Sequence, residues 1–340
     1  MKKRVLLLSL IILACVTLSV FAQGAAEASA FPVRPLVMIV PFNPGGATDL
    51  LARKAQPKME EVLGKPIAVQ NMAGGATAIG NQYVMDQAHD GHTLLAQPTD
   101  ITSIAIMGQS KLTSDDWSFL GIAAAVPSVF VVHPDSKIKT IQDLVAVMKT
   151  TKLTAAVAAS GCAWTRAIGL FADQLKLTLP QFVPSGGGYT AAVSAMKKEV
   201  DFAACGFAEA IELIKGGELR ALAYWGVEPV TLPNGTVVPT FGSVYPALKT
   251  FEPFGGWVGM AVPKGVPADV LAKLVNAYDI AIHQPDFIEF CKQSSFMFMG
   301  KIGADADAFA KLSTSVNAYL MYDLGFTPTD PATLGIQRVK

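Results

Sequence analysis

The feature that most constrains the fold is a repeated succession of a short apolar segment, a glycine-rich turn and a segment with helical periodicity. Residues 36–40 are continuously apolar, residues 41–46 form a Pro- and Gly-rich turn, and a helical pattern starts near Asp49. Residues 67–70, with Gly74 and Gly75 leading into residues 77–88, repeat this order. Such an alternation is typical of a mainly parallel sheet with helices on both faces. We therefore expect an α/β fold.

The same patterns continue along the chain and predict two α/β units. Further strands are expected at 93–96, 129–132, 154–158, 181–183, 202–204, 219–224 and 257–262, and helices at 141–149, 164–174 and 189–197. After Pro267 the pattern predicts helices alone, at 268–283, 286–292 and 304–322. Pro57 lies inside the first expected helix and predicts a kink or an early end there. Residues 231–236 read as an exposed hairpin around Asn-Gly. The units are expected to divide near Val126 and Gly255.

The amino terminus reads as an export signal. Lys2, Lys3 and Arg4 precede an apolar stretch at 5–22 and small-residue cleavage patterns up to Ala30. Residues 1–30 are predicted to be a cleaved signal peptide, which places the mature chain in the periplasm. A retained membrane anchor, or a lipid on Cys15, is the alternative.

Composition and cysteine content narrow the class of protein further. A chain that is 51% hydrophobic and 16% charged is not disordered. Loss of residues 1–30 leaves a net charge near −2, which excludes a strongly basic nucleic-acid binder. No metal site or cofactor is predicted. Cys162, Cys205 and Cys291 remain after processing, either as one disulfide with one free thiol or as three buried thiols.

The loop from Asn43 to Asp49 is the first candidate site. Its glycines leave backbone N–H groups unobstructed, and the following helix adds unpaired amides and a positive dipole end. This combination binds carboxylates or phosphates. The alternative is a tight strand-to-helix turn with Thr48 or Asp49 as the helix cap. Residues 71–77 and 184–189 are also glycine-rich, but they lack the spacing of a nucleotide-binding loop.

Residues 159–166 form a second candidate loop at a strand-to-helix junction. Ser160 or Cys162 would be the nucleophile of a secreted hydrolase, but no G-x-S-x-G elbow is present. We favour a second ligand-holding loop. Arg166 is expected at the solvated surface, with an anion contact as the alternative.

A set of motifs in a fixed order resembles one known family. These are residues 40–49 with Ala52-Arg53, 69–75, 90–95, 183–188, 200–202, 217–223 and 262–267. Together they resemble the substrate-binding proteins of the tripartite tricarboxylate transporters, also called the Bug family. The match spans nearly all of the mature chain. It departs at the second loop, where Cys162 and Thr165 stand at positions that commonly hold Ser and His.

The resemblance implies a two-lobed periplasmic binding protein of the type II-like class, each lobe a mainly parallel sheet flanked by helices. Lobe 1 would comprise residues 31–126 plus 256–340 and lobe 2 residues 127–255, with a hinge near 126–128 and 255–257. The ligand would be a small carboxylate, gripped by the two loops between the lobes. The predicted contact residues are Phe42, Asn43, Gly45, Gly46, Ala47, Thr48, Asp49, Ser160, Gly161, Cys162 and Thr165.

We therefore predict a non-enzymatic, monomeric solute-binding protein. It would deliver a small organic anion to a membrane transporter with one large and one small integral subunit. A secreted hydrolase and a ligand sensor for a membrane receptor are the alternatives. Asp49 is expected to cap its helix rather than contact an anion, because like charges repel.

Overall fold

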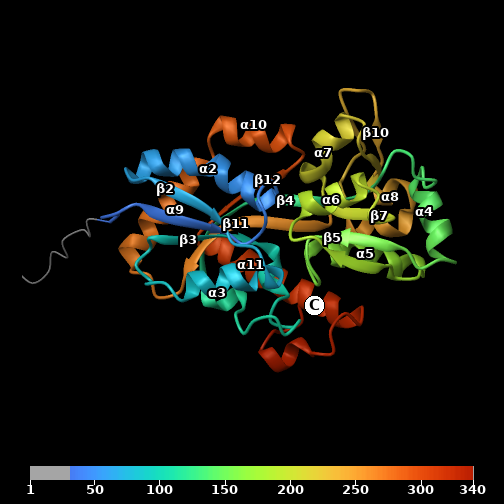
Figure 1. The fold of residues 1–340 in the computed structure, drawn as a ribbon. Coiled ribbons are helices and arrows are strands. Elements are labelled where there is room, and N and C mark those ends of the chain that lie inside the picture. Colours follow the sequence, from blue (N-terminus) through green and yellow to red (C-terminus); the bar gives the residue numbers. More distant parts are fainter. Residues whose placement is uncertain (1–30, 340) are drawn as a thin grey trace, which may run out of the picture.

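The structure, a computed structural model, describes residues 31–339. The predicted signal peptide and the lipid site at Cys15 lie outside the described residues. Ten strands form one sheet in the order β2-β1-β3-β11-β4-β7-β5-β6, and β12 and β8 also pair with β4. Helices lie on both sides of this sheet (Figure 1). Within residues 31–339 no helix is both long and apolar enough to cross a membrane.

The first half of the sheet holds the amino-terminal elements and the carboxy-terminal helices. Its strands are β1 (Leu36–Val40), β2 (Ile67–Asn71), β3 (Thr93–Pro98), β11 (Gly255–Pro263) and β12 (Met297–Ile302). Its helices and turns are α2 (Ala47–Leu63), η1 (Gly75–Thr77), α3 (Ala78–Met85), η2 (Thr99–Thr102), η3 (Ser114–Asp116), α9 (Ala268–Ile282), α10 (Pro285–Gln293), α11 (Ala304–Asp323) and η5 (Pro331–Leu334). β1 is continuously apolar because helices cover both of its faces.

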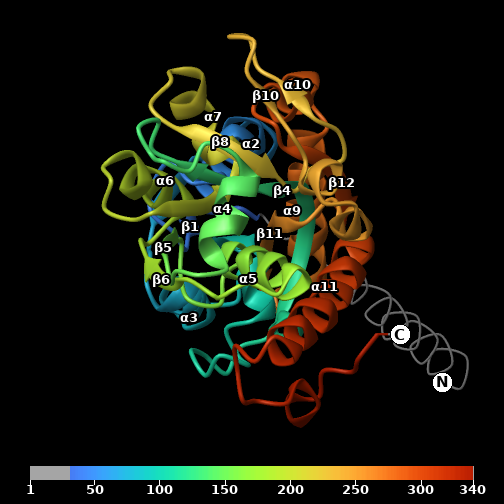
Figure 2. The same ribbon diagram turned by 90° about the vertical axis from the view of Figure 1, so that its right-hand side faces the viewer.

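The second half is seen end-on in Figure 2, with α4 and α5 toward the viewer. Its strands are β5 (Thr154–Val157), β6 (Gln181–Pro184), β7 (Phe202–Gly206) and β8 (Arg220–Tyr224). Its helices are α4 (Ile141–Met148), α5 (Ala163–Leu175), α6 (Gly188–Met196), α7 (Phe207–Lys215), α8 (Phe241–Val244) and η4 (Pro246–Phe251). The expected hairpin forms from β9 (Val230–Thr231) and β10 (Val237–Val238).

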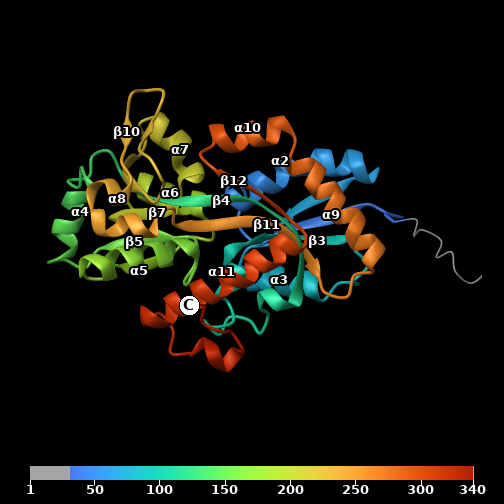
Figure 3. The same cartoon turned by 180° about the vertical axis from the view of Figure 1, so that it is seen from behind.

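Strand β4 (Trp117–Val132) belongs to both halves. Its residues 117–127 pair with β11, and its residues 128–132 pair with β7 and β8. The view from behind shows β4 and β11 running between the halves (Figure 3). The outer strands of each half are parallel, whereas the strands at this junction are antiparallel. The sheet is therefore mixed, with a parallel core in each half.

Helix α2 overturns one of the two outcomes expected from Pro57, an early end of the helix. The helix does not stop there but continues to Leu63, and it ends at Gly64, whose φ of 68° is left-handed. Pro57 and Arg53 lie on the exposed face, so the Arg53 carbonyl that loses its helical partner faces solvent. Leu51, Ala55 and Met59 hold the opposite face in the core.

Two further elements differ from expectation. The tail after Pro267 is not helical throughout, because β12 adds a strand to β4. Its register shifts between Phe298 and Lys301, so its side chains do not alternate regularly. Helix α7, which follows β7 directly, is absent from the expected elements.

Candidate functional site

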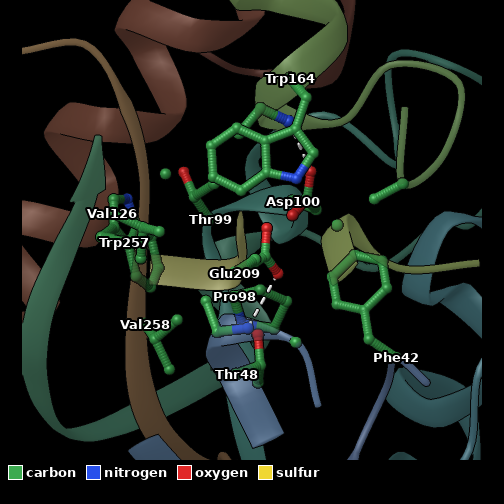
Figure 4. A pocket seen from close by; sticks show the side chains of 16 residues that line it. Phe42, Thr48, Pro98, Thr99, Asp100, Val126, Trp164, Glu209, Trp257 and Val258 are labelled. Carbon is green, nitrogen blue, oxygen red and sulfur yellow. Dashed lines mark hydrogen bonds between the residues drawn. The ribbon is translucent and has the colours of Figure 1, made fainter. Parts of the chain in front are cut away.

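A small, partly enclosed cavity lies between the two halves of the sheet (Figure 4). Its free volume is about 30 Å³, which is room for about two water molecules. The first half lines it with the start of α2 and with residues 98–100, and the second half with Trp164 and Glu209. Val126 and residues 256–258 of the two connecting strands complete the wall.

Two helices point their amino termini into this cavity. Helix α2 begins after Gly46 and helix α5 after Cys162, and neither of these N-cap residues makes a side-chain hydrogen bond to its helix. The first backbone N–H groups of such a helix need other partners, and the dipole favours negative charge there. The cavity therefore collects two anion-binding ends, one from each half of the sheet.

Carboxylates from the opposite half occupy both ends. Glu209, on α7, accepts a hydrogen bond from Ala47 N at 2.8 Å, and its second oxygen accepts one from Gly206 N at 2.6 Å. Asp100, in η2, accepts a hydrogen bond from Ala163 N at 3.0 Å. Each helix cap thus crosses from one half of the molecule to the other. Figure 4 shows both carboxylates facing the cavity.

Burial raises the pKa of both carboxyl groups. The pKa of Glu209 rises to about 7, since loss of solvent and the nearby charge of Asp100 outweigh its two backbone hydrogen bonds. Burial also raises the pKa of Asp100, although the Arg166 charge and the Ala163 amide oppose the shift. Near neutral pH the cavity thus holds a carboxyl group that titrates.

Only some of the residues predicted in the first loop reach the cavity. Phe42, Gly46, Ala47 and Thr48 line the cavity. Asn43, Gly45 and Asp49 do not, and Asn43 N donates instead to Gly186 O across the halves at 3.2 Å.

Asp49 holds the turn before α2 and does not cap an amide of the helix itself, which corrects the expected capping role. Its carboxylate accepts from Gly45 N at 3.0 Å, from Arg53 at 2.9 Å and from Asn71 at 2.9 Å. Burial alone would raise its pKa, but these three donors together lower it. The side chain is fully engaged within its own half of the molecule.

The predicted contact residues of the second loop lie beside the cavity rather than in its wall. Ser160 is exposed, and the Gly161 carbonyl accepts hydrogen bonds from Ser103 and Arg166. The Thr165 hydroxyl turns back to Ala159 O at 2.9 Å, and the Cys162 thiol lies 3.6 Å from it. The next helical residues, Ala163 and Trp164, reach the cavity instead.

Arg166 is not at the solvated surface, and that expectation is wrong. Its side chain is fully buried, and Nη1 donates to Ser103 Oγ at 3.0 Å and to Gly161 O at 2.9 Å. The charge of the guanidinium opposes the rise that burial causes in the pKa of Asp100. Arg166 does not line the cavity. It is therefore not in place to contact an anion bound there, which was the alternative role.

Sequence reasoning missed several residues that line the cavity, among them Thr99, Asp100, Glu209 and Trp257. A signal existed for Thr99 and Asp100, because they follow β3 directly and ligands bind at the carboxyl ends of parallel strands. Glu209 stands three residues after Gly206 in the first turn of a helix, a position where a carboxylate caps. Thr99 is 2% exposed, and its hydroxyl has no hydrogen-bond partner among residues 31–339.

The three cysteines of the described residues are all reduced. Within residues 31–339, Cys162, Cys205 and Cys291 are free and buried, so of the two alternatives left open by the sequence the structure has three buried thiols. Burial raises the pKa of all three, that of Cys291 to about 12. We expect no reaction with a thiol reagent at pH 8 in the folded protein and three modified thiols in guanidinium, counted by mass spectrometry. Rapid labelling of Cys162 in the folded state would contradict this.

The profile of the family described as Tripartite tricarboxylate transporter family receptor matches residues 51–314. A Pseudomonas sp. (strain P51) protein from the tcbD-tcbE intergenic region is 32% identical over 287 residues, which is 83% of each chain.

Two solved structures share the fold over most of the chain. The periplasmic binding protein BugD is 26% identical, with a TM-score of 0.76 over 87% of this chain and 99% of BugD. MatC from Rhodopseudomonas palustris, solved with bound malate, is 24% identical, with a TM-score of 0.75 over 85% of this chain and 99% of MatC.

Proposed function

Because the chain belongs to the tripartite tricarboxylate transporter receptor family, we propose that it captures a small carboxylate in the cavity between its two lobes. The captured anion would then be delivered to the large and small integral subunits of a tripartite transporter. Members of the family are solute-binding transport receptors and not enzymes, so the hydrolase alternative is set aside. BugD is a periplasmic binding protein, and we infer the same compartment for this chain.

The observation that carries the proposal is the pair of helix amino termini facing one cavity from opposite halves. Neither helix supplies its own side-chain cap, so the first amides of both point toward the cavity, where carboxylates of the opposite half hold the Ala47 and Ala163 amides. An anion held by both ends would join the halves. The unpartnered Thr99 hydroxyl adds a hydrogen-bond donor at the same place.

A carboxylate is the anion that fits this setting. Phe42, Trp164 and Trp257 give the cavity an apolar wall, which suits the carbon skeleton of an organic acid. MatC, which has the same fold, was solved with bound malate. Since the cavity holds only about 30 Å³, the lobes must open or side chains must move before such a ligand enters.

The proposed motion is a hinge between lobe 1, residues 31–126 plus 256–340, and lobe 2, residues 127–255. Strand β4 changes partners between Pro127 and Ser128, and Gly255 of β11 pairs opposite Pro127. Both connecting strands therefore pass from one half to the other at the same level of the sheet. Rotation there would separate α2 from Glu209 and Asp100 from α5.

Ligand screening by thermal shift tests the proposal. The protein from Phe31 would be heated with acetate, benzoate, succinate, L-malate, adipate or citrate, and with succinamide as a neutral control. A carboxylate at a hundredfold excess over its Kd should add about 2.7 kcal/mol of apparent stability. The fluorescence of Trp164 and Trp257 should change with the same Kd. Shifts with succinamide alone, or with none of the acids, would refute carboxylate capture.

A further inference from the structure

Glu209 occupies the position at α2 that an anionic ligand would take. One of its oxygens holds the Ala47 amide and the other the Gly206 amide. The side chain is fitted closely into place, because a Cβ added at Gly188 would overlap Glu209 Oε2. The residue is 7% exposed. The Ala47 amide, the first of α2, is thus already satisfied by a carboxylate of the protein itself.

We propose that Glu209 is a resident competitor at the α2 amino terminus, so that a carboxylate ligand binds there together with one proton. This inference rests on the proposed capture of carboxylates. The Ala47 amide has one hydrogen to donate, and it cannot satisfy both the ligand and an ionised Glu209. With Asp100 in the same wall, a further charge would place three carboxylates in a cavity with apolar walls.

Proton uptake resolves this conflict within the existing geometry. The proton comes from solvent and binds to one carboxylate oxygen of Glu209, which becomes neutral. The other oxygen still accepts the hydrogen bond from Gly206 N, and the new O–H donates to the incoming carboxylate. The ligand then receives the Ala47 amide and the favourable end of the helix dipole.

The groups packed around Glu209 set the pH range of the effect. Burial raises the pKa of Glu209 most, and the charge of Asp100, in η2, adds to the rise, which reaches about 7. Cys205, on β7, is neutral in this range, because burial and the Glu209 charge raise its pKa well above the ordinary value. Helices α2 and α6 face Glu209 with the Ala47 amide and with Gly188.

The sign of the pH dependence follows from this order of charges. Above about pH 7, Glu209 is ionised in the free protein, and each bound carboxylate must bring a proton. Affinity should then fall by up to about tenfold per pH unit. Below pH 7, Glu209 is already neutral, so the affinity should level off.

Calorimetric titration from pH 6.0 to 8.5 tests the inference. The probe is L-malate, followed by the most stabilising acid of the thermal-shift panel. For the wild type we expect Kd to rise about tenfold between pH 7.5 and 8.5. Titrations at pH 8 in phosphate and in Tris should report uptake of close to one proton per bound anion.

Two variants on α7 separate Glu209 from general effects of charge. Glu209→Gln should bind more tightly than wild type at pH 8, with a Kd that no longer depends on pH. Glu212→Gln, which changes an exposed carboxylate one turn further along the helix, should behave as the wild type. Anion binding without proton uptake in the wild type would overturn the role of Glu209 and leave carboxylate capture intact. Failure of every acid to bind at every pH would refute both.

Discussion

Replacing Arg166 with methionine should lower the free energy of unfolding at pH 7 by about 3–5 kcal/mol, the usual cost of leaving a buried charge without an opposing charge. Arg166 is completely buried, and its positive charge offsets part of the pKa rise that burial causes in Asp100. Methionine fills much of the same volume but leaves the Asp100 carboxylate buried without a compensating charge. Urea unfolding followed by tryptophan fluorescence would measure the loss.

The loss should shrink as the pH falls. Without Arg166, the pKa of Asp100 in the folded variant lies still further above its value in the unfolded chain. Between these two values the folded state binds a proton that the unfolded state does not, so stability increases toward acidic pH. Adding Asp100→Asn to the variant should recover part of the loss at pH 7, because the uncompensated charge is then gone.

Arg53→Met is the matched control. Arg53 also pairs with a buried aspartate, Asp49, but its own side chain is 47% exposed, and two further donors hold Asp49. Its loss should cost about 1 kcal/mol or less. Equal destabilisation by the two substitutions would contradict the burial of Arg166 as the cause.

The local features of the site could be predicted from sequence, and the contacts across the cavity could not. The turn from β1 to α2, the start of α2 after Gly46 and the hydrogen bond from Gly45 N to Asp49 depend on residues within a few positions of each other. The carboxylate on Ala47 comes from Glu209, 162 positions away. No periodicity or turn chemistry encodes that pairing, because it arises only when the two halves pack together.

Arg166 shows the same limit from the other side. A charged residue in the first turn of an amphipathic helix is ordinarily solvated. Inside the protein, its Nη1 donates to the Ser103 hydroxyl, 63 positions earlier in the chain, and to the Gly161 carbonyl. For the second loop, the resemblance predicted contacts from Ser160 and Thr165, whereas the structure places Ala163 and Trp164 in the cavity wall.

Gly46→Asp should weaken carboxylate binding by at least about 100-fold while leaving the fold intact. A Cβ at position 46 would lie 3.1 Å from Glu209 Oε1, so the new carboxylate would project into the cavity. Two charges about 4 Å apart repel by about 4 kcal/mol at an effective dielectric constant of about 20. The new side chain would also take up the free amides of the first turn of α2, which the ligand needs.

The fold should tolerate this change because position 46 has ordinary backbone geometry. Gly46 has φ −77° and ψ 168°, which any residue adopts, and it is the N-cap of α2, where aspartate is favoured. Without ligand the variant should still unfold in one cooperative transition, but at a lower temperature than wild type, because the new side chain also lies against Glu209. Gly46→Ser adds the same Cβ without a charge and should cost less than about tenfold in affinity, which isolates repulsion from bulk. Wild-type affinity in Gly46→Asp would mean that the anion binds away from α2, because no ligand carboxylate can share that helix end with both the introduced side chain and Glu209.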